Sequence, residues 1–222
     1  AVAFFFFAIG KRYYPVENVR ARPPRTQEQK QLERLTIKRI AGIFALIAVF
    51  WFVYDQAAST WIYFAKDHCD LWVIPGVFKV TPDQIQGLNP ILIVFLTPIF
   101  NAVWESWKRR RSGVDVPDTR KMLIGFFIVL GCTGMMSVAG FLAGAGKVTV
   151  WFLLVATFII TLAELCISVV GLEFAYKRAA PGTKSVVTAA FLFTVFVGDG
   201  ILGAPYDSLY DKALKPGAYF GI

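Results

Sequence analysis

The feature that most constrains the fold of this chain is a series of apolar segments, each long enough to cross a membrane as a helix. The hydrocarbon core of a bilayer is about 30 Å thick, so a crossing helix needs roughly 20 apolar residues. In 222 residues that are 56% hydrophobic, four segments meet this requirement clearly, and a fifth is interrupted by Asp199. The predicted spans cover residues 40–65, 82–107, 122–145, 148–176 and 185–204. The sequence therefore predicts an all-α, polytopic bundle of membrane helices.

The distribution of basic residues predicts the orientation of these spans. Five crossings place residues 10–39, 108–121 and 177–184 on one side of the membrane, with 9, 6 and 3 of the 23 Lys and Arg residues. Basic residues concentrate in cytoplasmic loops, so we expect these three segments to be cytoplasmic. The basic stretch WKRRR at 107–111 is typical of a membrane edge near anionic lipid, and we do not expect nucleic acid as a partner.

Both ends of the chain suggest a piece of a longer protein. Residues 1–10 are expected to end a preceding transmembrane helix, and residues 11–39 to form a cytoplasmic linker that contains a short interfacial helix. Residues 40–222 would form a carboxy-terminal bundle, and KPGAYFGI at the end predicts the start of its last helix. We therefore expect an amino-terminal bundle to be missing from this chain.

Catalytic and metal-binding patterns are absent from the sequence. It has no Ser/His/Asp set, no HExxH motif and no phosphate-binding glycine loop, and its three cysteines are dispersed. The stretch DHCD at 67–70 offers ligand types, but adjacent residues rarely converge on one ion without distant partners. Asp55 and Glu164 do not lie in motifs typical of an intramembrane aspartyl protease. We expect neither an enzyme nor a bound metal or cofactor.

Two carboxylates lie inside predicted spans, where charge is costly. Asp55 is the only formal charge between residues 40 and 65, and Glu164 falls near the middle of 148–176. Such groups could bind a cationic group, carry protons, or pair with basic residues. No basic residue occurs within any predicted span, so these carboxylates would need a partner from elsewhere. This favours a water-lined site completed by another bundle.

Other polar positions are consistent with such a site. Thr81 and Gln84 predict a capping box, and Asn89 then lies about 10 Å along the second helix. Ser168, four residues after Glu164, would lie on the same helix face. Glu173 is expected to pair with Lys177 for structural reasons.

The third span differs from the others because it has no charge. Its small residues recur at intervals of three and four, which favours close helix packing and contact with lipid rather than with substrate. They are Gly131, Gly134, Ser137, Gly140 and Gly144.

Several motifs in order resemble those of the proton-coupled oligopeptide transporters, a branch of the major facilitator superfamily. The stretch FWFVYDQAASTW at 50–61 is similar to the pattern of the seventh helix of that family. QIQGLNPILIVFLTPIF at 84–100 resembles the eighth, and TLAELCISVVGL at 161–172, followed by a basic residue and AAP, resembles the tenth. The eleventh helix is similar in outline. The resemblance covers residues 40–222 and implies the carboxy-terminal half of the facilitator fold, helices 7 to 11 with the ends of 6 and 12.

The resemblance implies proton-coupled symport of di- and tripeptides by alternating access, with the proton as the coupling ion. Glu164 would contact the amino terminus of the peptide and Asn89 its backbone, while Trp51 would line the cavity. Asp55 would take part in proton coupling. Ser168 and Phe191 complete the expected substrate site.

Four departures from the family pattern accompany the resemblance. Ala163, Val169 and Phe191 stand where glycine, proline and tryptophan are usual. Loss of the tryptophan at Phe191 shrinks one side-chain pocket and removes an indole donor, so the preferred peptide side chains are expected to differ. Asp199 stands where asparagine is common; it could titrate, but we favour a structural role. The variant LEFAY at 172–176 also suggests a divergent bacterial branch of the family, and we therefore expect the bacterial inner membrane. Alternatives are a facilitator for another small solute and a non-transporting membrane protein on the same scaffold.

Overall fold

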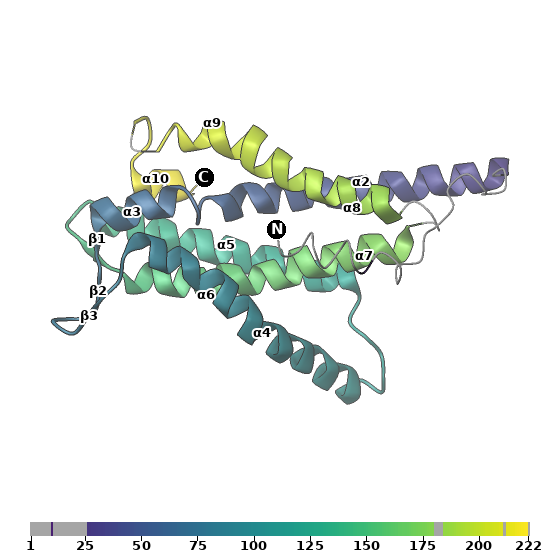
Figure 1. Ribbon diagram of the computed structural model, residues 1–222, viewed down its shortest axis with the longest axis horizontal. Coiled ribbons are helices and arrows are strands. Elements are labelled where there is room, and N and C mark those ends of the chain that lie inside the picture. The colour runs from purple at the N-terminus through teal and green to yellow at the C-terminus, as the bar shows by residue number, and fades with distance from the viewer. Residues whose placement is uncertain (1–9, 11–25, 180–183, 211, 222) are drawn as a thin grey trace.

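The computed structural model describes residues 10, 26–179, 184–210 and 212–221, and most of them lie in helices. Five helical segments in this part of the chain are long and apolar enough to cross a membrane, which confirms the predicted fold class. They are Ile40–His68, Pro82–Arg110, Asp118–Leu142, Trp151–Arg178 and Lys184–Asp207. The expectations for residues 1–9 and 11–25 lie outside the described residues. Figure 1 shows the spans as a bundle elongated along the helix direction.

Each predicted span corresponds to one helix or to a series of shorter ones. The elements in chain order are α2 (Gln27–Asp55), α3 (Thr60–His68), β1 (Cys69–Asp70), β2 (Trp72–Ile74), β3 (Phe78–Lys79), α4 (Pro82–Arg110), α5 (Asp118–Leu142), β4 (Val148–Thr149), α6 (Trp151–Glu164), η3 (Leu165–Val169), α7 (Val170–Arg178), α8 (Lys184–Phe196), η4 (Val197–Gly203), α9 (Ala204–Asp207) and α10 (Pro216–Gly221). The segments labelled η are π-helical turns.

The first span differs from the prediction at both ends of α2. The short interfacial helix expected before residue 40 is continuous with the span. The two form a single helix, α2, that begins at Gln27. The helix then ends at Asp55, and α3 begins only at Thr60. Two side chains bond to the backbone at this break: the Ser59 hydroxyl donates to the Asp55 carbonyl at 3.0 Å, and the Gln56 side chain donates to the Phe52 carbonyl at 3.4 Å. These bonds compete with the backbone ladder.

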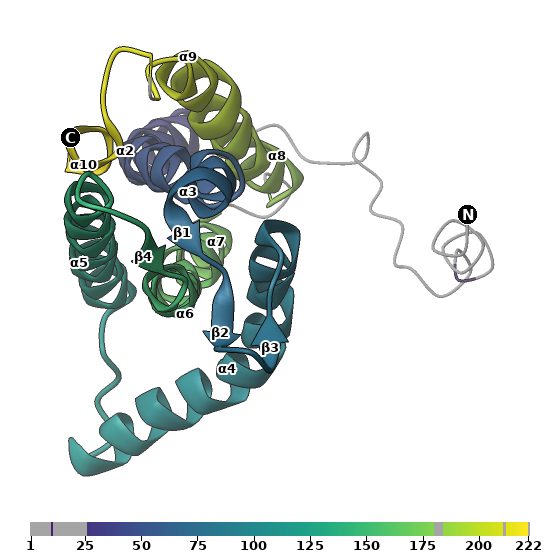
Figure 2. The same ribbon diagram turned by 90° about the vertical axis from the view of Figure 1, so that its left-hand side faces the viewer.

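Short strands join the helices at the end of the bundle opposite the start of α2 (Figure 1). β1 pairs with β4 in parallel, with Cys69 opposite Val148. β2 and β3 form an antiparallel hairpin, which Figure 2 shows beside the start of α4. The indole N–H of Trp151 donates to the carbonyl of Val73 at 3.3 Å. These contacts fix the start of α6 relative to the end of α3 and the start of α4.

The helix α4 begins as its sequence predicts and then leaves the bundle. The Thr81 hydroxyl accepts from the backbone N–H of Gln84, whose side chain accepts from the Thr81 N–H at 2.9 Å, which confirms the capping box. Pro90 and Pro98 lie within the helix, where neither can donate to the backbone ladder. Figures 1 and 2 show the second half of α4 diverging from the other helices. Only its first half can therefore contribute to a site within this bundle.

The small residues of α5 form two different surfaces. A Cβ on Gly140 would lie 2.5 Å from the backbone of Gly217, and the Ser137 hydroxyl donates to the Gly217 carbonyl at 2.7 Å. Gly131 and Gly134 have no neighbour within 4 Å of an added Cβ in the described structure. Close helix packing is therefore confirmed for the end of the stripe that meets α10.

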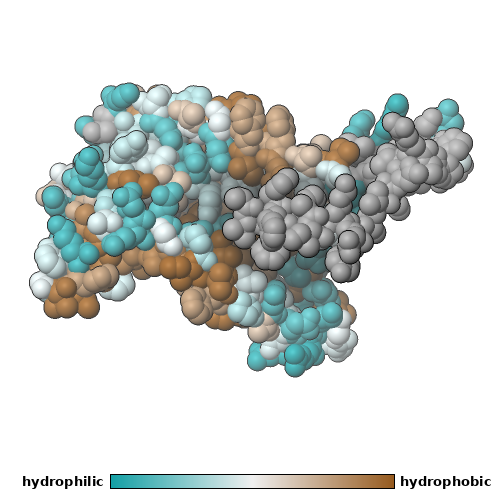
Figure 3. All heavy atoms as spheres, viewed as in Figure 1, coloured by the Kyte–Doolittle hydropathy of each residue, from teal (hydrophilic) through white to brown (hydrophobic). Residues whose placement is uncertain are grey.

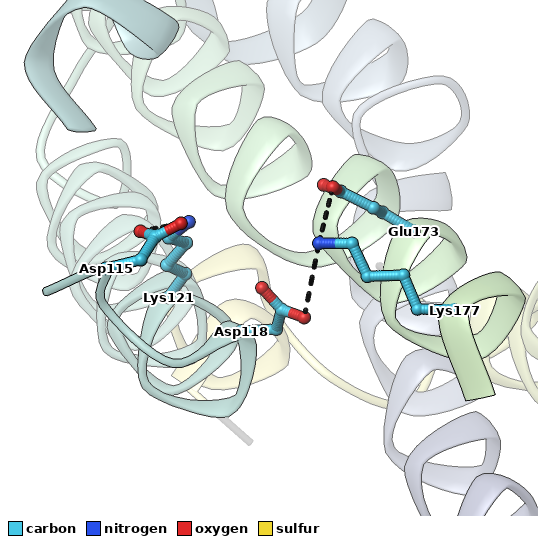
Figure 4. Close-up of polar contacts among 5 residues, drawn as sticks. All are labelled: Asp115, Asp118, Lys121, Glu173 and Lys177. Carbon is cyan, nitrogen blue, oxygen red and sulfur yellow. Dashed lines mark ion pairs between the residues drawn. The ribbon is translucent and has the colours of Figure 1, made fainter. Parts of the chain in front are cut away.

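Ion pairs gather at the basic end of the bundle (Figure 4). Lys177 pairs with Glu173 at 2.7 Å, as expected, and also approaches Asp118 of α5 at 3.9 Å. Lys121 pairs with Asp115 at 3.3 Å. Partial desolvation opposes ionisation of Asp115, but the hydrogen bond and charge of Lys121 outweigh it and lower the pKa of this carboxyl. The Glu173–Lys177 pair is exposed on both sides and so contributes little to stability, whereas Lys121 and Asp118 are half-buried.

The surface shows the layering expected of a membrane protein. Figure 3 shows hydrophobic residues gathered around the middle of the molecule and hydrophilic ones at the end of α4. Large exposed apolar side chains include Phe95 on α4, Phe127 on α5 and Phe193 on α8. Such side chains are stable in contact with lipid or with other apolar protein surfaces.

Gly198 allows η4 to approach α2 closely, and replacing it with alanine should destabilise the fold. An added Cβ would lie 2.5 Å from the Cβ of Trp51, 2.6 Å from the carbonyl of Ala48 and 2.8 Å from the backbone nitrogen of Phe52. None of these atoms is the end of a flexible side chain, so we expect Gly198→Ala to cost about 1–3 kcal/mol. Thermal unfolding of the detergent-solubilised protein should show a lower midpoint. Gly131→Ala, with open space at its Cβ, is the control, and equal midpoints for the two variants would contradict this prediction.

Candidate functional site

The structure brings Asn89 and Glu164 together from different helices. The Asn89 amide nitrogen donates to Glu164 Oε2 at 3.1 Å and to the hydroxyl of Thr161 at 3.0 Å. Asn89 lies in the first half of α4, and Glu164 is the last residue of α6. Thr161 is buried and donates in turn to the carbonyl of Thr157 at 2.7 Å. The result is a polar cluster between two transmembrane segments.

Tyr54 joins this cluster from α2. Its hydroxyl interacts with the side chains of both Glu164 and Asn89. Sequence reasoning missed Tyr54 because a tyrosine in an aromatic segment gives no distinct signal. It also missed Thr161, although its position three residues before Glu164 places both on one helix face.

A cavity adjoins the polar cluster. It has a volume of about 190 Å³ and is lined from α2, α3, α4 and α6. Its polar wall includes Tyr54 and Asn89, and most of its other residues are apolar or small, among them Ala57, Ala58 and Ile160. A group bound there would meet hydrogen-bonding side chains on one side and apolar surface on the other. This combination is typical of small-molecule sites.

The π-helical turn η3 directly follows Glu164. A π turn contains an extra residue and so changes which side chains face a neighbouring helix. Ser168 lies within this turn, is half-buried, and is not among the residues that line the cavity. Such turns occur often at functional sites, which is consistent with the position of Glu164 beside one.

Asp55 belongs to a second group of polar residues, at the end of α2. Asp207 on α9 lies close enough for its charge to act on Asp55, and Asp55 acts in the same way on Asp199 of η4. An added Cβ at Gly203 would lie 3.1 Å from Asp55 Oδ2, so the glycine leaves room for this carboxylate. Asp199 Oδ1 is buried and has no hydrogen-bond partner among the described residues. The three carboxylates therefore gather where the first and fifth spans meet.

Ion pairs in the described part of the chain involve none of these three half-buried carboxylates. They involve Asp115, Asp118 and Glu173, all at the basic end. Because like charges repel, a group of carboxylates is stabilised by any cation that joins it, whether a proton or a basic side chain.

Gln56 organises the region around Asp207. Its side chain is buried and donates to Asp207 Oδ1 at 2.9 Å, and it accepts from the hydroxyls of Thr60, at 2.9 Å, and Tyr219. The Tyr219 hydroxyl also contacts Asp207 at 3.2 Å. This network connects the break after α2 with α9 and α10.

Replacing Gln56 with leucine should destabilise this network. The change removes partners from Thr60, Asp207 and Tyr219 in a buried place, and an unsatisfied buried polar group costs about 1–3 kcal/mol. We expect a lower unfolding midpoint in detergent than for wild type. Gln31→Leu, at an exposed position of the same helix, serves as the control. An unchanged midpoint for Gln56→Leu would show that the network does not contribute to stability.

The two aromatic candidates occupy different environments. Trp51 packs edge-on against Tyr54 at 5.3 Å between ring centroids, and its indole nitrogen is buried with no hydrogen-bond partner among the described residues. Phe191 is only 5% exposed and packs edge-on against Phe44 at 5.8 Å. Phe191 therefore lies in the packing between α2 and α8 and does not line the cavity.

Comparisons with known proteins agree on one family. A family model described as the POT family matches residues 15–220. Similar curated proteins include an uncharacterized transporter, YclF, of Bacillus subtilis, 27% identical over 199 residues that make up 88% of this chain and 38% of the relative. The peptide transporter YePEPT of Yersinia enterocolitica is 29% identical over 149 residues, 64% of this chain and 28% of that protein. The chain thus spans well under half of the length of these relatives.

Solved structures show the same similarity. A crystal structure of a peptide transporter POT in complex with alafosfalin matches 99% of this chain and 42% of its own, with a TM-score of 0.75 and 25% identity. The POT family transporter PepTSo matches 81% of this chain and 34% of its own, with a TM-score of 0.63 and 28% identity. The described helices therefore have the arrangement found in part of these transporters.

Proposed function

This chain belongs to the POT family, and on that premise we propose that it provides one part of the site of a proton-driven importer of di- and tripeptides. It is a multi-pass membrane protein whose family and fold are those of transporters. The observation that carries the proposal is the contact between Asn89 and Glu164 beside a cavity. Peptide transport is named for the Yersinia relative described above.

Glu164 would bind the ammonium group of the peptide, and Asn89 would bind its first amide group. A peptide presents an ammonium group and, a few ångströms away, an amide carbonyl. A carboxylate is the natural partner of the ammonium. Both hydrogens of the Asn89 amide are used by Glu164 and Thr161, so Asn89 would donate to the carbonyl by exchanging its bond to Thr161 for one to the peptide. Trp51 and Ser168 do not line this cavity and would border only a part of the peptide that extends beyond it. Phe191 would support the site from within the packing of α2 against α8.

Asp55 would couple transport to the proton. It lies inside the first span with two other carboxylates nearby, and no ion pair between described residues neutralises it. Either a proton or a basic side chain from elsewhere in the longer protein would neutralise Asp55. Exchange between the two would link the protonation of Asp55 to conformation. Tyr54, the preceding residue in α2, contacts Glu164 and Asn89. Adjacent residues of α2 therefore belong to the proton site and to the peptide site.

The complete site would form between this bundle and a second one, as in alternating access around a central site. The second bundle corresponds to the remaining length of the relatives and would supply the cationic partner of Asp55. The three basic segments, residues 11–39, 108–121 and 177–184, would face the cytoplasm of a bacterial inner membrane. The proton is the only coupling ion required.

Uptake by the full-length protein in liposomes tests the proposal. Labelled dialanine should accumulate inside when the outside is made acidic, and an ionophore that collapses the proton gradient should prevent accumulation. Excess unlabelled dipeptide should compete, whereas free alanine should not. Accumulation that ignores the proton gradient, or a transported solute that is not a peptide, would contradict the proposal.

A further inference from the structure

Tyr54 occupies a position in the polar cluster for which neither the sequence pattern nor the comparisons provide a role. Its hydroxyl interacts with Glu164 and Asn89, and its ring lines the cavity. It lies on α2, whereas Asn89 lies on α4 and Glu164 on α6. Tyr54 is therefore the point at which a third transmembrane segment contacts the pair of residues proposed to hold the peptide.

The orientation of the Tyr54 ring is restricted by neighbouring aromatic side chains. Trp51 packs edge-on against it at 5.3 Å, and Phe50 lies at 5.6 Å, both measured between ring centroids. Phe50 is itself buried, and Trp51 is held against η4 by the close approach of Gly198. A ring fixed on these sides directs its hydroxyl toward one place, which here is the Glu164 carboxylate.

The Tyr54 hydroxyl leaves acceptor sites on the Glu164 carboxylate free for a ligand. An ionised carboxylate offers about four acceptor sites, of which Tyr54 and Asn89 use two. The others remain for the three donors of an ammonium group. Two fixed donors on one carboxylate also restrict its rotation, so less freedom is lost when the ligand binds.

We propose that Tyr54 is a positioning residue that acts through Glu164, holding its carboxylate in the orientation that receives the ammonium group of the substrate. This inference rests on the proposed function for the identity of the ligand. The contact itself does not depend on that function and can be tested separately.

Tyr54→Phe keeps the ring and removes only the hydroxyl. In the full-length protein we expect dialanine binding, measured by calorimetry, to weaken about tenfold, as for a hydrogen bond to a charged group. In liposomes KM should rise by the same factor while kcat changes less than twofold, which a general loss of structure would not produce. Tyr63→Phe, at an exposed position on α3, should match wild type in both assays. Binding by Tyr54→Phe that equals or exceeds wild type would overturn the proposal.

A double-mutant cycle separates this inference from the proposed function. Unfolding midpoints of Tyr54→Phe, Glu164→Gln and the double variant should be non-additive, because residues in contact are coupled. Additive shifts would show that the two side chains act independently and would overturn the inference even if the protein binds peptides. If wild type binds no dipeptide, the proposed function fails, and the cycle still decides whether Tyr54 acts on Glu164.

Discussion

Glu164→Gln should reduce dialanine binding to the full-length protein by at least about 30-fold. The substitution preserves the size of the side chain and its contact with Asn89, but it removes the negative charge that would pair with the peptide ammonium. Losing one partner of a desolvated, hydrogen-bonded charge pair costs about 2–5 kcal/mol, and 2 kcal/mol corresponds to about 30-fold in affinity. Calorimetric titration of wild type and variant at the same pH measures this difference directly.

Glu173→Gln is the matched control for this prediction. Glu173 lies on α7, in the same transmembrane segment as Glu164, but it is exposed and pairs with Lys177 at 2.7 Å at the basic end. Removing this charge should leave dialanine affinity within about twofold of wild type, since exposed ion pairs contribute little. If both variants lost affinity equally, the loss would come from the charge of the helix as a whole. If Glu164→Gln bound as tightly as wild type, Glu164 would not receive the ammonium group.

The parts of the fold that follow from local rules were predictable from the sequence. The spans follow from apolar length, the start of α4 from Thr81 and Gln84, and the Glu173–Lys177 pair from its spacing on a helix. In each case the determining residues lie within one turn or one continuous segment. The sequence alone therefore contains the information that these features require.

The meeting of Asn89 with Glu164 was expected only through the family resemblance, because the two residues are 75 positions apart. The roles of Tyr54 and Thr161 were missed, since each depends on which neighbour its helix meets. The break after Asp55 was missed as well. It coincides with side chains that bond to the backbone within an apolar segment, and such bonds do not alter a hydrophobic pattern.

Two of the departures from the family pattern lie in π-helical turns. Val169, where proline is usual, is the last residue of η3, and Asp199 lies within η4. Both turns lie next to carboxylates of the proposed mechanism. Asp199 Oδ1 is buried without a hydrogen-bond partner among the described residues, and the charge of Asp55 acts on this carboxylate. A structural role for Asp199 thus remains a prediction, now with a specific neighbour.

Asp55→Asn should abolish accumulation of dialanine driven by a proton gradient while leaving peptide exchange intact. Asparagine has nearly the same shape and keeps hydrogen-bonding capacity, but it cannot bind and release a proton. One unit of pH difference provides about 1.4 kcal/mol, enough for tenfold accumulation when one proton accompanies each peptide. In liposomes with an acidic exterior, wild type should therefore concentrate labelled dialanine, and the variant should only equalise it across the membrane.

Counterflow distinguishes a loss of coupling from a loss of transport. Liposomes loaded with unlabelled dialanine and placed in labelled dialanine without a pH difference should take up label through either wild type or Asp55→Asn, because exchange needs no net proton movement. Asp67→Asn, near the end of α3 and outside the group of three carboxylates, should behave as wild type in both assays.

Two outcomes would contradict this prediction. If Asp55→Asn were inactive in counterflow, Asp55 would act in peptide binding or folding. If Asp55→Asn still accumulated peptide, another group would carry the proton. Asp199 and Asp207, which surround Asp55, would then be the next residues to replace, since their charges face the same site from the fifth span.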